Sequence, residues 1–279
     1  MNTLLVHSAL VPFAVSAVAA GLLRLIGGAE RGAMIAAAGI SLAFLVGYML
    51  ILGLPAAWPT SAAQKILVIA VLATIVGLAL DLSKDTPEVT RLLAYLLPLA
   101  ALLWIGWARV TAPDWADIAA LAVIVIAGGF AIARTLAQGA EATESGIKLM
   151  VAAAALGFIA VLGRSASFGQ LAGILAAATA GFLAWNWPVP RFRFAAAAVL
   201  GGGVIFLTLT GAVAVFTNAA KPALCLLVPI FFADMAVGRV RIGTRRLDNA
   251  VRPALVFVVA LIPAIAAVGL AHLLGGSSY

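Results

Sequence analysis

Charge is what this sequence lacks most. Of its 279 residues only 10% are Asp, Glu, Lys or Arg, whereas 65% are hydrophobic, and the mean hydropathy is +1.19. A soluble globular domain contains about 45–50% apolar residues. So few charges cannot cover a water-facing surface, which excludes an ordinary soluble domain and predicts an integral membrane protein.

Cysteine and histidine are also scarce. The single cysteine, Cys225, excludes an intramolecular disulfide and a cysteine metal cluster. His7 and His272 are the only histidines, and nothing in the sequence supplies the supporting ligands that a metal or haem site needs. We therefore predict no cofactor and no metal ion.

Enzyme motifs are missing as well. The chain has no phosphate-binding Gly-Lys-Ser/Thr loop, no H-E-x-x-H and no G-x-S-x-G elbow. These absences lean against an enzyme, although a lipid-modifying enzyme stays open because membrane active sites can be sparse.

Long apolar runs, in contrast, are abundant. A membrane-spanning helix needs about 17–25 mostly apolar residues, and the chain offers ten such candidates. They predict an all-α, polytopic helical bundle that forms a single membrane domain over residues 1–279, with no soluble domain. The candidates cover approximately residues 3–25, 33–54, 61–82, 88–107, 113–134, 147–162, 167–187, 194–216, 222–237 and 252–274.

Ten spans divide evenly into two halves, residues 1–137 and 147–279. Because each half would hold an odd number of helices, the second would be inverted relative to the first. Inverted halves are common in secondary transporters, which bind substrate near the membrane midplane between the halves. No residue-by-residue repeat accompanies this division, which any ten-helix chain would allow.

The basic stretch at residues 238–252 orients the chain, since it carries five arginines between two apolar runs. Short loops rich in Lys and Arg stay in the cytoplasm. The five odd-numbered loops hold 13 of the 17 basic residues, so both termini are predicted on the non-cytoplasmic side of the cell (inner) membrane. The net charge of +7 is scattered along these loops, and we predict no nucleic-acid binding.

Asp234 is the most informative acidic residue, because it lies inside the apolar run of residues 231–237. Carboxylates within membrane spans are costly and often serve ion or proton pathways. Alternatively, Asp234 lies one turn from the inner boundary and pairs with Arg239 or Arg241.

Four further acidic and polar groups and a lysine are pathway candidates. Asp81 and Asp85, four residues apart, would share a helical face and form a cytoplasmic gate or cation entry, or else a solvated helix end. Thr208, Asn218 and Lys221 follow one helix and its outer turn. They would line an outer vestibule, or else make hydrogen bonds between helices.

Helix-breaking residues fall within several predicted spans. They predict kinked or locally unwound helices, whose exposed backbone groups can bind ions or substrates. Alternatively, they reflect the higher frequency of Gly and Pro in membrane helices. The breakers are Pro12, Pro98, Pro229, Pro263 and the triplet Gly201, Gly202 and Gly203.

Two functional classes follow. The first is a small-molecule permease or secondary transporter. The second is a non-catalytic membrane subunit or assembly factor, held in a larger complex by its Ala/Gly-rich helix faces. The low number of charges expected inside spans favours the second, because transporters usually carry an ionisable group there. Membrane lipids are the predicted partners, with a homo-oligomer or a membrane-protein partner left open.

Overall fold

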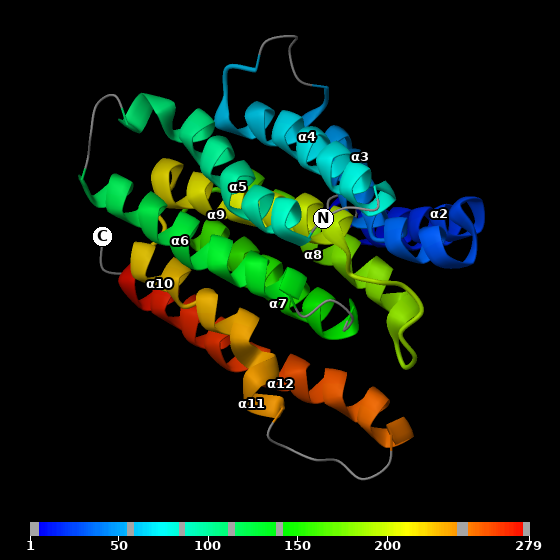
Figure 1. Cartoon of the computed structure of the whole chain (residues 1–279). Helices are drawn as coiled ribbons and strands as arrows, with labels where there is room; N and C mark the ends of the chain where they lie inside the picture. Colours follow the sequence, from blue (N-terminus) through cyan, green and yellow to red (C-terminus); the bar gives the residue numbers. More distant parts are fainter. Residues whose placement is uncertain are drawn as a thin grey trace.

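The structure is a computed structural model that describes residues 6–54, 59–83, 87–110, 115–137, 142–238 and 245–275. Every regular element in these ranges is a helix (Figure 1). Eight of the described helices are long and apolar enough to cross a membrane. A shorter apolar helix and a broken segment account for the other two predicted spans, which confirms a multi-pass helical bundle of eight to ten segments.

The elements follow the predicted spans closely in chain order. Two short elements, η1 and η2, are π-helical, and η3 is a 3-10 helix. The bounds are η1 Val6–Leu10, α2 Val11–Ile35, α3 Ala38–Leu52, α4 Ala62–Leu82, α5 Pro87–Val110, α6 Trp115–Ala137, α7 Ala142–Leu162, α8 Ala166–Asn186, η2 Ala197–Gly202, α9 Gly203–Phe216, α10 Lys221–Cys225, η3 Val228–Phe232, α11 Ala233–Val237 and α12 Arg245–Gly275.

The reversal between the first two predicted spans occurs inside α2. Gly28 interrupts the helix with φ +71° and ψ −166°, a conformation that glycine adopts readily because it has no Cβ. The chain folds back there, since a Cβ on Gly32 would lie only 2.5 Å from the carbonyl oxygen of Arg24. The loop predicted between residues 25 and 33 is therefore a tight turn within α2.

The helix pair η2–α9 forms the centre of the bundle. In the most apolar 18-residue stretch of residues 197–216, 94% of the residues are buried, the highest share among the eight spans. Helices α4, α5, α6 and α8 pack around it, and Figure 1 shows α9 running through the middle of the molecule. A helix that is apolar on all sides is expected in such a position.

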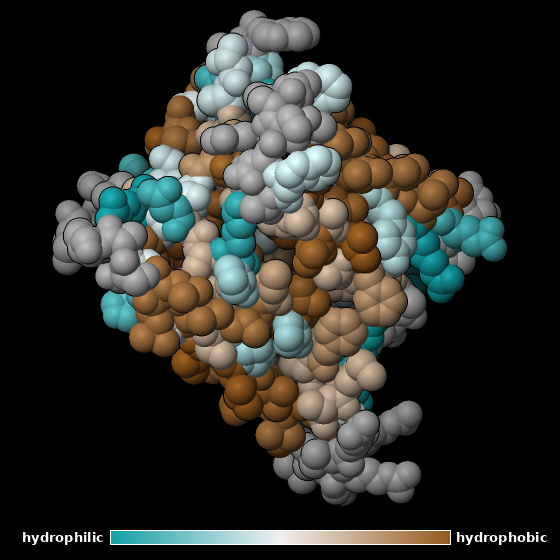
Figure 2. Space-filling view, turned by 90° about the vertical axis from the view of Figure 1, so that its left-hand side faces the viewer, coloured by the Kyte–Doolittle hydropathy of each residue, from teal (hydrophilic) through white to brown (hydrophobic). Residues whose placement is uncertain are grey.

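The peripheral helices have the opposite character. In the corresponding stretches of residues 6–35 and 251–275, only 17% and 28% of the residues are buried. Hydrophobic residues cover much of the face seen in Figure 2, with hydrophilic residues in separate patches. Exposed apolar surface on this scale requires a lipid environment.

The predicted span at 222–237 is not one continuous helix. It is divided into α10, η3 and α11, with Pro222 near the start of α10 and Pro229 in the first turn of η3. Proline has no amide hydrogen and disrupts a helix interior, which explains the break and confirms that Pro229 acts as a breaker. This broken segment packs against α6, α7, α9 and α12.

Candidate functional site

Asp234 in α11 is the centre of a buried charge cluster. Its Oδ2 accepts a hydrogen bond from Arg134 Nη2 at 2.7 Å, and its Oδ1 accepts one from Arg134 Nη1 at 3.1 Å. Lys148 Nζ donates to the same Oδ1 at 3.0 Å. Arg134 belongs to α6 and Lys148 to α7, so one carboxylate joins three helices.

Arg134 also holds the backbone of the broken segment. Its Nη1 donates a hydrogen bond of 2.8 Å to the carbonyl oxygen of Phe231 in η3, and its guanidinium lies 5.0 Å from the ring centroid of Phe232. A break in a membrane helix frees backbone carbonyls that need another donor. Arg134 supplies that donor at the junction of η3 and α11.

Lys148 is the most deeply buried of these charges, with 1% of its side chain exposed. A lysine is almost never fully buried unless it is paired. Four residues earlier on α7, the buried Glu144 forms an ion pair with Arg252 of α12, with 2.7 Å between Glu144 Oε1 and Arg252 Nε. The cluster thus contains three cations and two carboxylates, and it joins α11 of the broken segment to α6, α7 and α12.

These contacts give Asp234 two partners that the sequence did not suggest. Its described partners are Arg134 and Lys148, whereas Arg239 and Arg241 lie outside the described residues. Asp81, Glu144, Lys148 and Asp234 are all buried, and each lies near an end of its helix.

Three of the five cluster residues were assigned by the sequence to cytoplasmic loops. Arg134 ends α6, Lys148 is near the start of α7, and Arg252 is near the start of α12. The cluster therefore lies near the ends of its helices, on the side predicted to be cytoplasmic. A usable signal was present for Lys148, since it follows Ile147 into an apolar run and lies four residues after Glu144.

Asp81 makes a different kind of contact. It lies at the end of α4 and is buried, and its two oxygens accept the backbone N–H groups of Ala196 at 2.8 Å and Ala197 at 2.9 Å. It thus satisfies the free amides at the start of the η2–α9 pair from another helix. Asp81 does not lie on a solvated helix end, and its proposed companion Asp85 is outside the described residues.

Thr208, Asn218 and Lys221 do not join the Asp234 cluster. Thr208 is buried in α9, and its hydroxyl has no hydrogen-bond partner among the described residues. Asn218 is exposed after α9, where its backbone N–H donates to the carbonyl oxygen of Gly163 at 3.1 Å. Lys221 begins α10, at the opposite end of the broken segment from Asp234.

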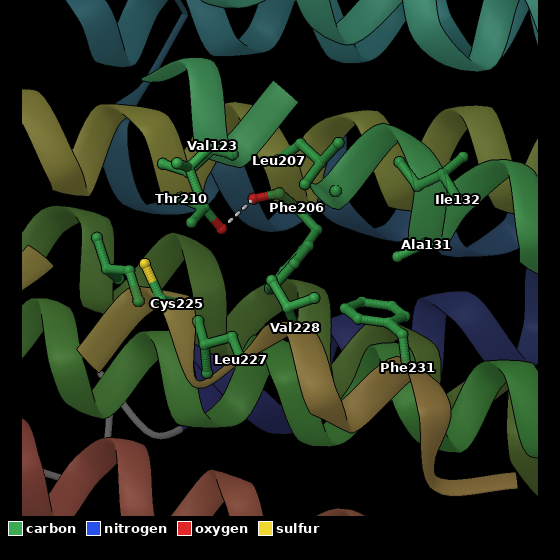
Figure 3. A pocket seen from close by; sticks show the side chains of 13 residues that line it. Val123, Ala131, Ile132, Phe206, Leu207, Thr210, Cys225, Leu227, Val228 and Phe231 are labelled. Carbon is green, nitrogen blue, oxygen red and sulfur yellow. Dashed lines mark hydrogen bonds between the residues drawn. The ribbon is translucent and has the colours of Figure 1, made fainter. Parts of the chain in front are cut away.

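A small apolar cavity lies between α6, α9 and the broken segment (Figure 3). Its volume is about 30 Å³, and Val228 and Phe231 of the broken segment form part of its wall. Thr210 points a hydroxyl toward its own helix and donates to the Phe206 carbonyl oxygen at 2.8 Å. None of the predicted pathway residues that the structure describes lines this cavity.

Among the described side chains, no three histidine, cysteine, aspartate or glutamate residues come together in a way that could hold a metal ion. The fold and the charge cluster define a polytopic α-helical membrane protein with a broken span anchored by buried ion pairs. No protein-family model and no curated protein matches the chain.

Proposed function

We propose that this protein is a small-molecule permease or secondary transporter, in which the broken segment 221–237 moves and its ion pairs to α6 and α7 act as the cytoplasmic gate. One observation carries the proposal: Asp234 lies on an interrupted span and is held by Arg134 and Lys148. The gate is formed by charges whose burial needs a functional explanation.

Interrupted helices support this function on physical grounds. Non-helical backbone at membrane depth is tolerated only where protein buries it or where it lines a cavity. Transporters place such discontinuous helices at their substrate sites, because half-helix ends and unwound backbone carbonyls can bind substrates and ions. Here the segment also lines the cavity between α6 and α9, so its displacement would enlarge that cavity.

The ion pairs favour two discrete positions of the segment. In the present position Asp234 satisfies two cations from different helices. Movement of α11 would separate them, and the exposed charges would then need water or a charged ligand. Such an exchange is what a gate that opens to an aqueous phase requires.

Cys225 permits a test that needs no knowledge of the substrate. It is the chain's single cysteine, it lines the cavity and it is exposed. In proteoliposomes, we expect a membrane-impermeant maleimide to label Cys225, and Asp234→Asn to change the labelling rate by weakening the gate. Glu30→Gln, at an exposed acid on α2, is the matched control and should leave the rate unchanged.

The opposite pattern would refute the gate. If only a membrane-permeant maleimide labels Cys225, and Asp234→Asn labels at the wild-type rate, then the segment neither meets water nor depends on the ion pairs.

A non-catalytic subunit or assembly factor is the second candidate. The observation that favours it is the size of the cavity in Figure 3, which at about 30 Å³ holds roughly one water molecule. Extraction in a mild detergent from native membranes separates the two candidates. A stoichiometric protein partner supports a subunit, and a chain that purifies alone supports a transporter.

A further inference from the structure

A long apolar groove lies on the outside of the bundle between α7 and α12. Its main part has a volume of about 690 Å³, within the range of roughly 300–1,000 Å³ that ligand sites occupy. Met150, Ala154 and Phe158 line one side, and Phe257, Leu261 and Ile265 line the other. Because it is open along the membrane-facing surface of two spans, its natural occupant is a hydrophobic molecule.

The groove continues toward the end of the bundle that holds the charge cluster. A second hollow of about 280 Å³ shares Met150 and Phe257 with the first, and Trp187 and Pro253 line it. On α12, Pro253 and the outermost lining residue, His272, are about 29 Å apart at 1.5 Å per residue. That distance matches a hydrocarbon core of about 30 Å.

A partly exposed arginine lies at the inner end of the groove. Arg252 immediately precedes the lining residue Pro253, and 33% of its side chain is exposed, whereas its partner Glu144 is 6% exposed. Arg245 and Arg246 precede it in the same helix. Arg252 is thus the more exposed member of this ion pair. The exposed indole of Trp187 lines the same end of the groove, and tryptophan favours the membrane interface.

We propose that this groove binds an anionic phospholipid of the cytoplasmic leaflet, with an acyl chain between α7 and α12 and the headgroup phosphate at Arg252. Apolar walls over the hydrocarbon depth suit the chain, and guanidinium suits the phosphate because it presents several donors in one plane. Basic pockets between membrane helices on the cytoplasmic side bind anionic headgroups in this way.

Native mass spectrometry of the full chain can test this site. The protein is reconstituted in nanodiscs of equal phosphatidylglycerol and phosphatidylcholine with identical acyl chains, released into detergent and analysed for bound lipid. We expect the wild type to retain phosphatidylglycerol in preference. Arg252→Gln should reduce that preference about fivefold, and Arg252→Lys should keep most of it because the charge remains.

A second set of variants tests the groove itself. Leu261→Trp fills the middle of the groove and should reduce retention of both lipids. If it does not fold, Ile265→Trp at the exposed rim replaces it. Two matched controls should behave as wild type: Arg191→Gln, an exposed arginine on the same predicted side, and Leu103→Trp, an exposed leucine on α5.

Three results would overturn the proposal. They are equal retention of the two lipids by the wild type, an unchanged preference in Arg252→Gln, and unchanged lipid retention in the groove-filling variant. A second protein chain occupying the groove in place of lipid would overturn it as well.

Discussion

The buried carboxylate of Asp234 balances the charges of both Arg134 and Lys148. Two cations from different helices converge on it within 3.1 Å. A buried ion pair adds little stability compared with an apolar pair of similar size, but removal of one partner leaves an uncompensated buried charge. The consequence is a large asymmetry between single and paired substitutions.

We predict that Asp234→Ala lowers the free energy of unfolding by about 3–5 kcal/mol. The substitution removes the carboxylate that pairs with Lys148, whose side chain is only 1% exposed. Adding Lys148→Met should restore part of that loss. Denaturant titration in detergent micelles measures both, with Glu30→Gln as a neutral surface control. Losses that simply add in the double variant would show that the two residues act independently.

Asp81 offers a second prediction at this scale. Its carboxylate accepts two backbone N–H groups, those of Ala196 and Ala197, whereas an asparagine would present one oxygen and one N–H₂ donor. Hydrogen bonds to a charged group contribute about 1.5–3 kcal/mol each, so Asp81→Asn should lower the free energy of unfolding by about 2 kcal/mol. The same titration tests it, with Glu88→Gln on the exposed start of α5 as control. A change as small as that of Glu88→Gln would contradict the capping role.

The sequence identified Asp234 and Asp81 but not their partners. Charge and position along the chain single out an acid inside an apolar run. Which groups reach that acid depends on how helices far apart in sequence pack, and Arg134 is 100 residues from Asp234. Lys148 was missed because a basic residue near a span boundary resembles a loop charge.

At the scale of elements, a close approach of two backbones in the centre of the bundle depends on Gly77. A Cβ at this position would lie 2.6 Å from Ala197 Cα and 2.9 Å from the Ala196 carbonyl oxygen. Both are backbone atoms, which cannot move aside by a change of rotamer. The absence of a side chain at Gly77 is what brings Asp81, one turn later, into contact with the start of η2.

We therefore predict that Gly77→Ala destabilises the protein by about 1–3 kcal/mol, despite the higher helix propensity of alanine. Gly173→Ala on α8 is the matched control, because a Cβ there meets no atom within 4 Å. Thermal unfolding followed by circular dichroism compares the two. If the thermal unfolding midpoint of Gly77→Ala is as high as that of Gly173→Ala, then α4 and η2 can move apart without a loss of stability, which would contradict the prediction.

Most helix ends were predictable from sequence to within about five residues, since backbone groups in lipid must be satisfied within each span. The larger differences are α12, which begins seven residues before the predicted 252, and α2, which continues through the Gly28 turn to Ile35. The irregular parts were less predictable. Pro229 was recognised as a breaker, yet the apolar run around it predicted one helix, because composition does not reveal where a neighbouring side chain such as Arg134 can satisfy the freed carbonyl of Phe231. The turn at Gly28 was likewise expected only as a loop between two spans.

At the scale of the whole molecule, the distribution of basic residues makes one prediction about orientation. Four of the five arginines of residues 238–252 precede the last span, and the fifth, Arg252, lies at its start, since the apolar helix covers Val251–Gly275. If these arginines are cytoplasmic, the chain after that span must be on the other side. The buried charge cluster and the proposed lipid headgroup site would then both face the cytoplasm.

We predict that alkaline phosphatase, which is active only outside the cytoplasm, is active when fused after Tyr279 and inactive when fused after Gly243. A green fluorescent protein fusion should show the reverse, because only one span separates the two points. Fusion to a leaderless cytoplasmic protein controls for leakage of the enzyme. The reversed pattern would place the arginines outside the cell, and equal activity at both points would mean that α12 does not cross the membrane.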